Sequence, residues 1–219
     1  MGKYLKKFEN HSAYEAAESG LILPNVSLCV QEHDVHYNPY VPPIIDGHEY
    51  VDLGLPNGTM WATMNVGASS ITDYGNYYQY GKGSGQYAAT SGQSNYSGTE
   101  NPLAATADTA TVEWGGSWHM PTSAQCAELT ANTTYEWTTI NGVNGGKFTA
   151  ANGNYVFFPA SGFYQNGIVY DIGISGFYWG STTDHSTYAK CLVLGDGNGN
   201  RGLGYPRRSN GYPVRPVVG

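Results

Sequence analysis

Asp196, Asn198 and Asn200 stand at alternate positions, as the first ligands of a calcium-binding EF-hand loop do. In such a loop the sixth residue is glycine and the twelfth is glutamate. This chain has Arg201 and Arg207 at those positions, so two required features are missing. The spacing therefore favours a turn rich in glycine and asparagine between two strands.

Histidines offer a second route to metal binding. His33 and His36 are three residues apart in an acidic segment, but no third imidazole or thiol lies at a recognised ligand spacing. A solvated polar loop is the preferred interpretation of that segment. His119, between a tryptophan and a methionine, is expected to be a packed or hydrogen-bonded histidine of the core. The sequence thus predicts no metal and no other cofactor.

The motifs of common enzyme classes do not occur in the sequence. There is no G-x-S-x-G, H-E-x-x-H, P-loop or Rossmann glycine pattern. Asp108 and Glu113 are close together, but two carboxylates need a cleft to act as acid and base. Cys29, Cys126 and Cys191 are widely spaced and form no CxxC pair, so we expect small buried or partly buried thiols. We therefore expect that the protein is not an enzyme.

Aromatic side chains supply chemistry of another kind, which is binding. The chain has 19 tyrosines, and tyrosine gives large contacts at a low entropic cost, as in antibody loops. Between residues 163 and 207 the aromatic residues stand among Thr, Asp, Asn and Arg, which add adaptable hydrogen bonds. This stretch is predicted to form a binding surface. The net charge of −7 argues against nucleic acid as the ligand, because phosphates are bound by clusters of Lys and Arg.

The elements that must hold this surface are short. Residues 50–55 alternate like a strand, a Pro-Asn-Gly turn follows, and residues 59–63 form a second strand, which together predict a hairpin. Thr122 and Gln125 fit a capping box, which predicts the start of a helix with Cys126 and Leu129 on its inner face. Later in the chain only short strands separated by glycine turns are predicted. They cover residues 147–149, 155–158, 176–180, 190–194 and 212–218.

This pattern predicts an α+β domain, loop-rich, with small twisted antiparallel sheets and two short helices. Residues 1–45 differ from the rest, because Ser12 and Glu15 fit a capping box for a short helix and prolines gather at 39–43. We therefore expect an N-terminal attachment segment at 1–45 and one domain at 46–219. No signal peptide or membrane-spanning run is evident, so the chain is expected to be made in a cytoplasm.

Several motifs of the domain occur in the order known from one family. They are YVDLGLPNGTMWATMNVGA at 50–68, YGNYY at 74–78, WHMPT at 118–122, FPASG at 158–162, GFYWGS at 176–181 and NGYPVRPV at 210–217. Together they resemble the FISUMP family (major paralogous domain), which is common in surface and phage-derived proteins of gut bacteria, including the human gut. The resemblance implies a C-type-lectin-like fold in which the N- and C-terminal strands pair, here residues 50–55 beside 212–218.

The resemblance also implies a function. Some lectin-fold proteins of such phages are variable proteins of diversity-generating retroelements, which rewrite adenine-containing codons near the 3′ end of the gene. Such codons do not become Lys, Glu, Gln, Met or Trp, and residues 180–208 contain none of these except Lys190. The implied role is ligand or receptor binding by a hypervariable surface. The positions expected to vary and to contact the ligand are Phe163, Tyr164, Ile168, Tyr170, Asp171, Phe177, Asp184, His185, Thr187, Tyr188, Cys191, Val193, Asn198, Asn200, Leu203, Tyr205 and Arg207.

Location and partners follow from the same resemblance. Residues 1–45 resemble the leader of structural proteins from phages of gut bacteria, which implies attachment to phage structural proteins in a virion, at the tail or particle surface. The expected target is an unknown protein or glycan on a bacterial surface, with no nucleic acid and no membrane. Particle-bound display proteins are often symmetric, so association of identical copies is a further expectation.

Two alternatives remain open. One is an adhesive or structural module of a bacterial cell envelope, with the same fold and an invariant surface. The other, more distant, is an enzyme that uses unrecognised residues. The Glu-Pro-Asn and Trp-Asn-Asp motifs of calcium-dependent sugar-binding lectins do not occur in this sequence, so the implied lectin shape carries no expectation of calcium.

Overall fold

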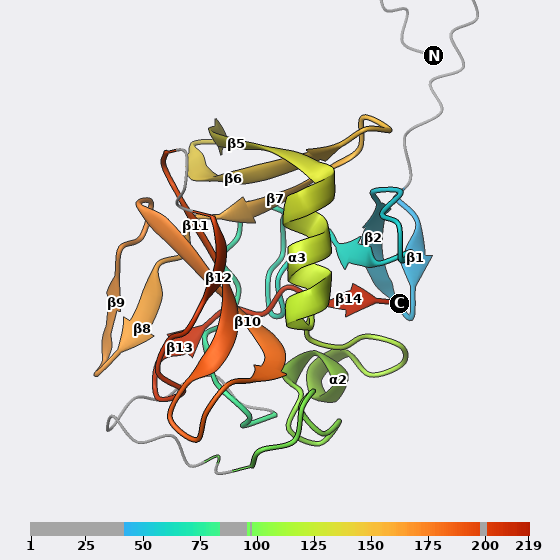
Figure 1. Ribbon diagram of the computed structural model, residues 1–219. Helices are drawn as coiled ribbons and strands as arrows, with labels where there is room; N and C mark the ends of the chain where they lie inside the picture. The colour runs from blue at the N-terminus through green and yellow to red at the C-terminus, as the bar shows by residue number, and fades with distance from the viewer. Residues whose placement is uncertain (1–41, 84–95, 97, 198–200) are drawn as a thin grey trace, which may run out of the picture. The chain divides into compact units, whose positions relative to one another are not determined.

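The computed structural model describes residues 42–83, 96, 98–197 and 201–219. Most of the predicted N-terminal segment lies outside the described residues, including its helix, Cys29, His33 and His36. Within the described residues the chain has the predicted α+β architecture, with small antiparallel sheets and two short helices (Figure 1). No helix in this part of the chain combines the length and apolar character needed to cross a membrane.

The first sheet joins the beginning of the described chain to its end, in the order β1-β2-β3-β14. The predicted hairpin is confirmed as β2 and β3, which pair through Tyr50↔Ala62 and Val51↔Trp61. The four strands are Ile44–Ile45, His48–Asp52, Met60–Ala62 and Val217–Val218.

The expected pairing of residues 50–55 with 212–218 is wrong. β14 pairs with β3, through Val217↔Trp61. β1 already occupies the outer edge of β2, because the turn at Asp46 folds it back along that strand. A continuous strand over 212–218 is also wrong, since two prolines in this stretch cannot donate hydrogen bonds to a ladder.

Helix α3, Ser123–Asn132, begins where the capping box predicts it. The Gln125 N–H donates to the Thr122 hydroxyl at 3.2 Å, and the Thr122 N–H donates to the Gln125 side-chain oxygen at 2.9 Å. Cys126 and Leu129 are buried, as their spacing predicts. The helix also buries Glu128, whose carboxylate accepts hydrogen bonds from the turn between β2 and β3.

Helix α2, Thr109–Trp114, is absent from the sequence-based prediction. Its β-branched residues are weak helix formers, and the helix depends on the carboxylate of Asp108 at its N-cap. That carboxylate accepts hydrogen bonds from the Thr111 N–H at 2.9 Å and from the Met120 N–H at 2.9 Å. Burial raises the pKa of Asp108. Asp108 is therefore part of the framework of this region.

The remaining strands form three further sheets, in the orders β5-β6-β7, β10-β11-β12 and β4-β13-β8-β9. The strands predicted at 147–149, 155–158, 176–180 and 190–194 are confirmed within β6, β7, β10 and β11. The bounds are β4 Tyr78–Gln79, β5 Thr133–Ile140, β6 Val143–Ala150, β7 Tyr155–Pro159, β8 Phe163–Gln165, β9 Ile168–Tyr170, β10 Ser175–Thr183, β11 Ala189–Gly195, β12 Gly202–Gly204 and β13 Gly211–Tyr212.

Two clusters of buried side chains hold these sheets together. The first contains Trp61, Phe158 and Tyr178 together with the inner face of α3. The second contains Trp179 and Tyr212. Tyr178 and Trp179 are neighbours on β10 and point into different clusters, because side chains alternate between the two faces of a strand. Both side chains are almost completely buried, so these two residues belong to the scaffold.

Candidate binding surface

Strands β11 and β12 bring several of the predicted contact residues onto one face. Leu192 pairs with Leu203, and an isolated bridge pairs Tyr188 with Arg207 in the same register. Paired residues of antiparallel strands lie on the same face, and every second residue along a strand returns to it. Lys190 and Tyr205 lie midway between these two pairs, so their side chains are on the same face. We call this surface the ladder face, and it consists of Tyr188, Lys190, Leu203, Tyr205 and Arg207.

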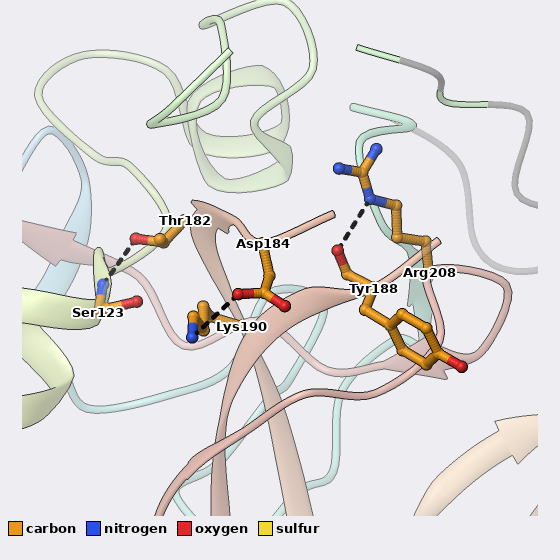
Figure 2. A network of polar contacts seen from close by, with 6 residues as sticks. All are labelled: Ser123, Thr182, Asp184, Tyr188, Lys190 and Arg208. Atoms are coloured by element: carbon orange, nitrogen blue, oxygen red, sulfur yellow. Dashed lines mark hydrogen bonds and ion pairs between the residues drawn. The ribbon is translucent and has the colours of Figure 1, made fainter. Parts of the chain in front are cut away.

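Each cation of the ladder face lies against a tyrosine of the neighbouring segment. The Lys190 Nζ is 3.5 Å from the ring centroid of Tyr205, and the Arg207 Cζ is 5.8 Å from that of Tyr188. Lys190 also forms an ion pair with Asp184, 3.2 Å from Nζ to Oδ1 (Figure 2). The contact with Tyr205, and after it Asp184, raises the pKa of Lys190, so the amine stays charged. Because Tyr205 is 56% exposed, much of its ring remains open to a ligand.

The backbone under the ladder face is fixed by a buried cation, Arg208. Its Nε donates to the Tyr188 carbonyl oxygen at 3.2 Å, while the Tyr188 ring points away from the guanidinium (Figure 2). Its Nη1 donates to the Gly98 carbonyl oxygen at 2.9 Å, and the guanidinium lies 5.1 Å from the Tyr80 ring centroid. Arg208 thus ties the loop before β11 to the interior of the domain.

The start of α3 supports the same region. The Ser123 N–H donates to the Thr182 hydroxyl at 2.8 Å, two residues before Asp184 (Figure 2). Asp184, His185 and Thr187 are exposed in the turn between β10 and β11. These three predicted contact residues therefore border the ladder face on a turn that is anchored at both ends.

Another group of predicted residues gathers at the β8–β9 hairpin. Phe163 pairs with Tyr170 across the hairpin, and their rings stack with centroids 5.3 Å apart. Phe177 meets the Phe163 ring edge to face at 5.5 Å and pairs with Val193 on β11. We call these four half-buried or exposed residues the hairpin patch. Because Val193 alternates with Leu192 on β11, the hairpin patch and the ladder face lie on opposite faces of the β10-β11-β12 sheet. The stretch 163–207 thus presents two surfaces.

Three further predicted positions lie around the hairpin. Tyr164 points to the other side of it and lies near Tyr77, with ring centroids 6.2 Å apart. Ile168 is exposed at the end of the hairpin. Asp171 is exposed after β9, where its carbonyl oxygen accepts hydrogen bonds from the Ile174 and Ser175 N–H groups.

Cys191 does not belong to any candidate surface. Its side chain is 0% exposed and packs in the cluster of Trp179 and Tyr212. The expectation that Cys191 contacts a ligand is therefore wrong, because the register of β11 turns this position inward. Cys126 and Cys191 are both buried and free, as expected of small structural thiols. Asn198 and Asn200 lie outside the described residues.

Three residues of these surfaces were missed by the sequence-based prediction. Lys190 was treated as an exception to the codon pattern, yet it lies in the middle of the ladder face. Ile172 and Ile174 are 48% and 67% exposed in the turn that follows β9. The succession of large apolar residues at 168, 170, 172 and 174, separated by small or polar ones after Tyr170, was the signal that could have identified the two isoleucines.

A shallow depression of about 550 Å³ lies at the end of the β10-β11-β12 sheet. Asp171, Val193 and Leu203 contribute to its lining, together with Arg201. Among the residues that the structure describes, no group of three His, Cys, Asp or Glu side chains is placed to hold a metal ion. The geometry of the candidate site is therefore that of an open, mixed aromatic and polar surface.

Comparison of the chain with protein-family models, with curated proteins and with solved structures returns no match.

Proposed function

We propose that this chain is a ligand- or receptor-binding display protein of a phage, with a C-type-lectin-like domain of the FISUMP type and a surface diversified by a retroelement. Its N-terminal segment, residues 1–45, would attach it to the particle. The resemblance of the quoted motifs is one support. The other is the arrangement of the ladder face.

One observation carries the proposal. Tyr205, Arg207 and Leu203 are exposed at alternate positions of one edge segment, whereas the positions between them face the interior side of the sheet. Side chains at such positions can change without altering the core, which is the property that a diversified surface needs. Tyrosine and arginine are also the residue types that dominate binding energy at protein surfaces.

The gene offers a direct test of diversification. Among related isolates, differences that arise from adenine positions should concentrate in the codons of the ladder face and the hairpin patch, with a reverse transcriptase gene nearby. The codons for Trp179 and Cys191 should be spared or restricted to small apolar replacements, because these side chains are fully buried. A uniform pattern of substitution would instead favour an invariant module of the cell envelope.

Binding can be tested with labelled protein and mixed gut bacteria. The double variant Tyr188→Ala with Tyr205→Ala should lose more than about tenfold of its cell binding in flow cytometry, since truncated aromatic anchors carry most of an interface's energy. Tyr155→Ala is the matched control. Tyr155 is 42% exposed and lies under Lys147, 4.8 Å from Nζ to ring centroid, on another sheet. Equal binding by the double variant and the parent would show that the ladder face is not the binding surface.

A further inference from the structure

We infer that the ladder face binds an acidic polysaccharide, with Arg207 holding a carboxylate of the ligand and Tyr205 lying against a sugar ring. This inference rests on the proposed function and adds the chemical class of the ligand. The charges of the ladder face, the spacing of its side chains and the polar groups around it all fit such a ligand.

Arg207 is the cation of the ladder face that is left for a ligand. Lys190 is already paired with Asp184. Among the described residues, no carboxylate forms an ion pair with Arg207. Its guanidinium presents a planar set of donors that matches a carboxylate in two parallel hydrogen bonds. In a protein with a net charge of −7, this exposed site of positive charge selects for an anionic group in the ligand.

Tyr205 places a flat apolar surface beside that cation. Tyr205 and Arg207 are two residues apart on one extended segment, which sets their Cα atoms about 7 Å apart. This spacing is comparable with the size of one sugar residue that carries a carboxylate. The Lys190 ammonium, 3.5 Å from the ring centroid, fixes the orientation of the ring before the ligand arrives.

Hydrogen-bonding groups surround the two side chains. Asp184, His185 and Thr187 are exposed on the adjoining turn and can bond the hydroxyl groups of a sugar. A polymer of acidic residues such as polyglutamate would satisfy Arg207 but would offer no apolar ring face to Tyr205. The combination of a cation, an open aromatic ring and neighbouring polar groups therefore favours an acidic glycan.

Polygalacturonate is a suitable probe, because every sugar residue carries a carboxylate. Immobilised polygalacturonate should bind the full-length chain more tightly than dextran, which is uncharged, or polyglutamate, which has no sugar. Binding should weaken as salt is added, since the contact with Arg207 is electrostatic. Arg207→Gln should weaken it at least about tenfold, as expected for loss of a charge-assisted pair. Lys147→Gln removes the same charge from a lysine over Tyr155 and should leave binding unchanged.

Three results would overturn the inference. They are equal binding of dextran, binding of polyglutamate as tight as that of polygalacturonate, and a loss in Arg207→Gln no larger than in Lys147→Gln. Failure of the ligand class can be told apart from failure of the proposed function. If cells bind in a Tyr205-dependent manner while polygalacturonate does not, the binding surface stands and the acidic glycan is wrong.

Discussion

His48 stacks on Trp114 with ring centroids 3.7 Å apart and meets Trp118 edge to face at 6.2 Å. Burial lowers the pKa of His48 from its ordinary value of 6.5, against a smaller opposing effect of Asp46. The neutral ring is thus favoured in the folded state. The stability that depends on it is present above pH 6.5 and is lost as the pH falls through the lower pKa of the folded state.

We predict that the urea concentration at the unfolding midpoint decreases when the pH is lowered from about 7 to about 5. His48→Phe should make this decrease smaller. Phenylalanine keeps an aromatic ring against Trp114 but does not titrate. His185→Phe, a change in an exposed turn, should keep the pH dependence of the parent. An identical pH dependence in the parent and His48→Phe would contradict the assignment.

The exposure of some single side chains could be predicted from the sequence, and that of others could not. The abundance of tyrosines and their mixture with polar residues correctly indicated exposed rings such as Tyr170 and Tyr205. The codon pattern implied by the family resemblance placed Cys191 on the surface. This was wrong because the orientation of a side chain depends on strand register, and register is set by pairing with distant residues. The sequence also does not reveal that Lys190 lies in the middle of the ladder face, because its contact with the Tyr205 ring forms only when the two segments pair.

Among the elements, the β8–β9 hairpin has one glycine with positive φ directly before it and another at its tip, in different surroundings. Gly162, with φ of +60°, lies where a Cβ atom would overlap the Tyr170 carbonyl oxygen. Gly167, with φ of +87°, is at the tip of the hairpin and has open space around its Cβ position. Only Gly162 therefore combines backbone strain with a steric conflict when it is replaced.

Gly167→Ala should lower the free energy of unfolding by about 1 kcal/mol, the cost of a left-handed conformation. Gly162→Ala should lower it by about 3 kcal/mol or more, because strand β9 must also move away. Urea denaturation of the two variants measures the difference. Equal losses would mean that the end of β9 does not pack against residue 162.

The elements differ in how well the sequence predicts them. Helix α3 was predicted because its capping box is local, formed by Thr122 and Gln125. Helix α2 was missed because the carboxylate of Asp108 at its N-cap is held in place by a hydrogen bond from the Met120 N–H, and Met120 lies beyond the end of the helix. Strands of two or three residues, such as β13 and β14, have too few positions for a period of two to be visible.

At the scale of the whole molecule, Arg215 joins segments from three regions of the chain. Its Nε donates to Asn65 Oδ1 at 2.7 Å, and its Nη1 donates to the Thr63 carbonyl oxygen at 2.9 Å. Its Nη2 donates to the Phe157 carbonyl oxygen at 3.0 Å. The side chain is completely buried, and burial lowers the pKa of Arg215 to about 10.

Arg215→Met should lower the free energy of unfolding by about 3–5 kcal/mol, because buried carbonyl acceptors would lose their donor. Arg215→Lys should also be destabilising, since an ammonium cannot reproduce the planar fork. Arg207→Met is the exposed control and should change stability by less than about 0.5 kcal/mol. Guanidinium denaturation compares the three. A small loss in Arg215→Met would refute its role as a link between segments.

The pairing of β14 with β3 has a consequence for how the domain is made. Trp61 acquires its neighbour Val217 only after nearly all of the described chain has been synthesised. Until then the nascent chain carries an open strand edge on β3, of the kind that pairs with other chains and aggregates. Contacts between such distant residues also slow folding, because a long loop must close before they form. A ribosome-bound fragment that ends before β14 should therefore be more susceptible to proteolysis than a fragment that extends beyond β14.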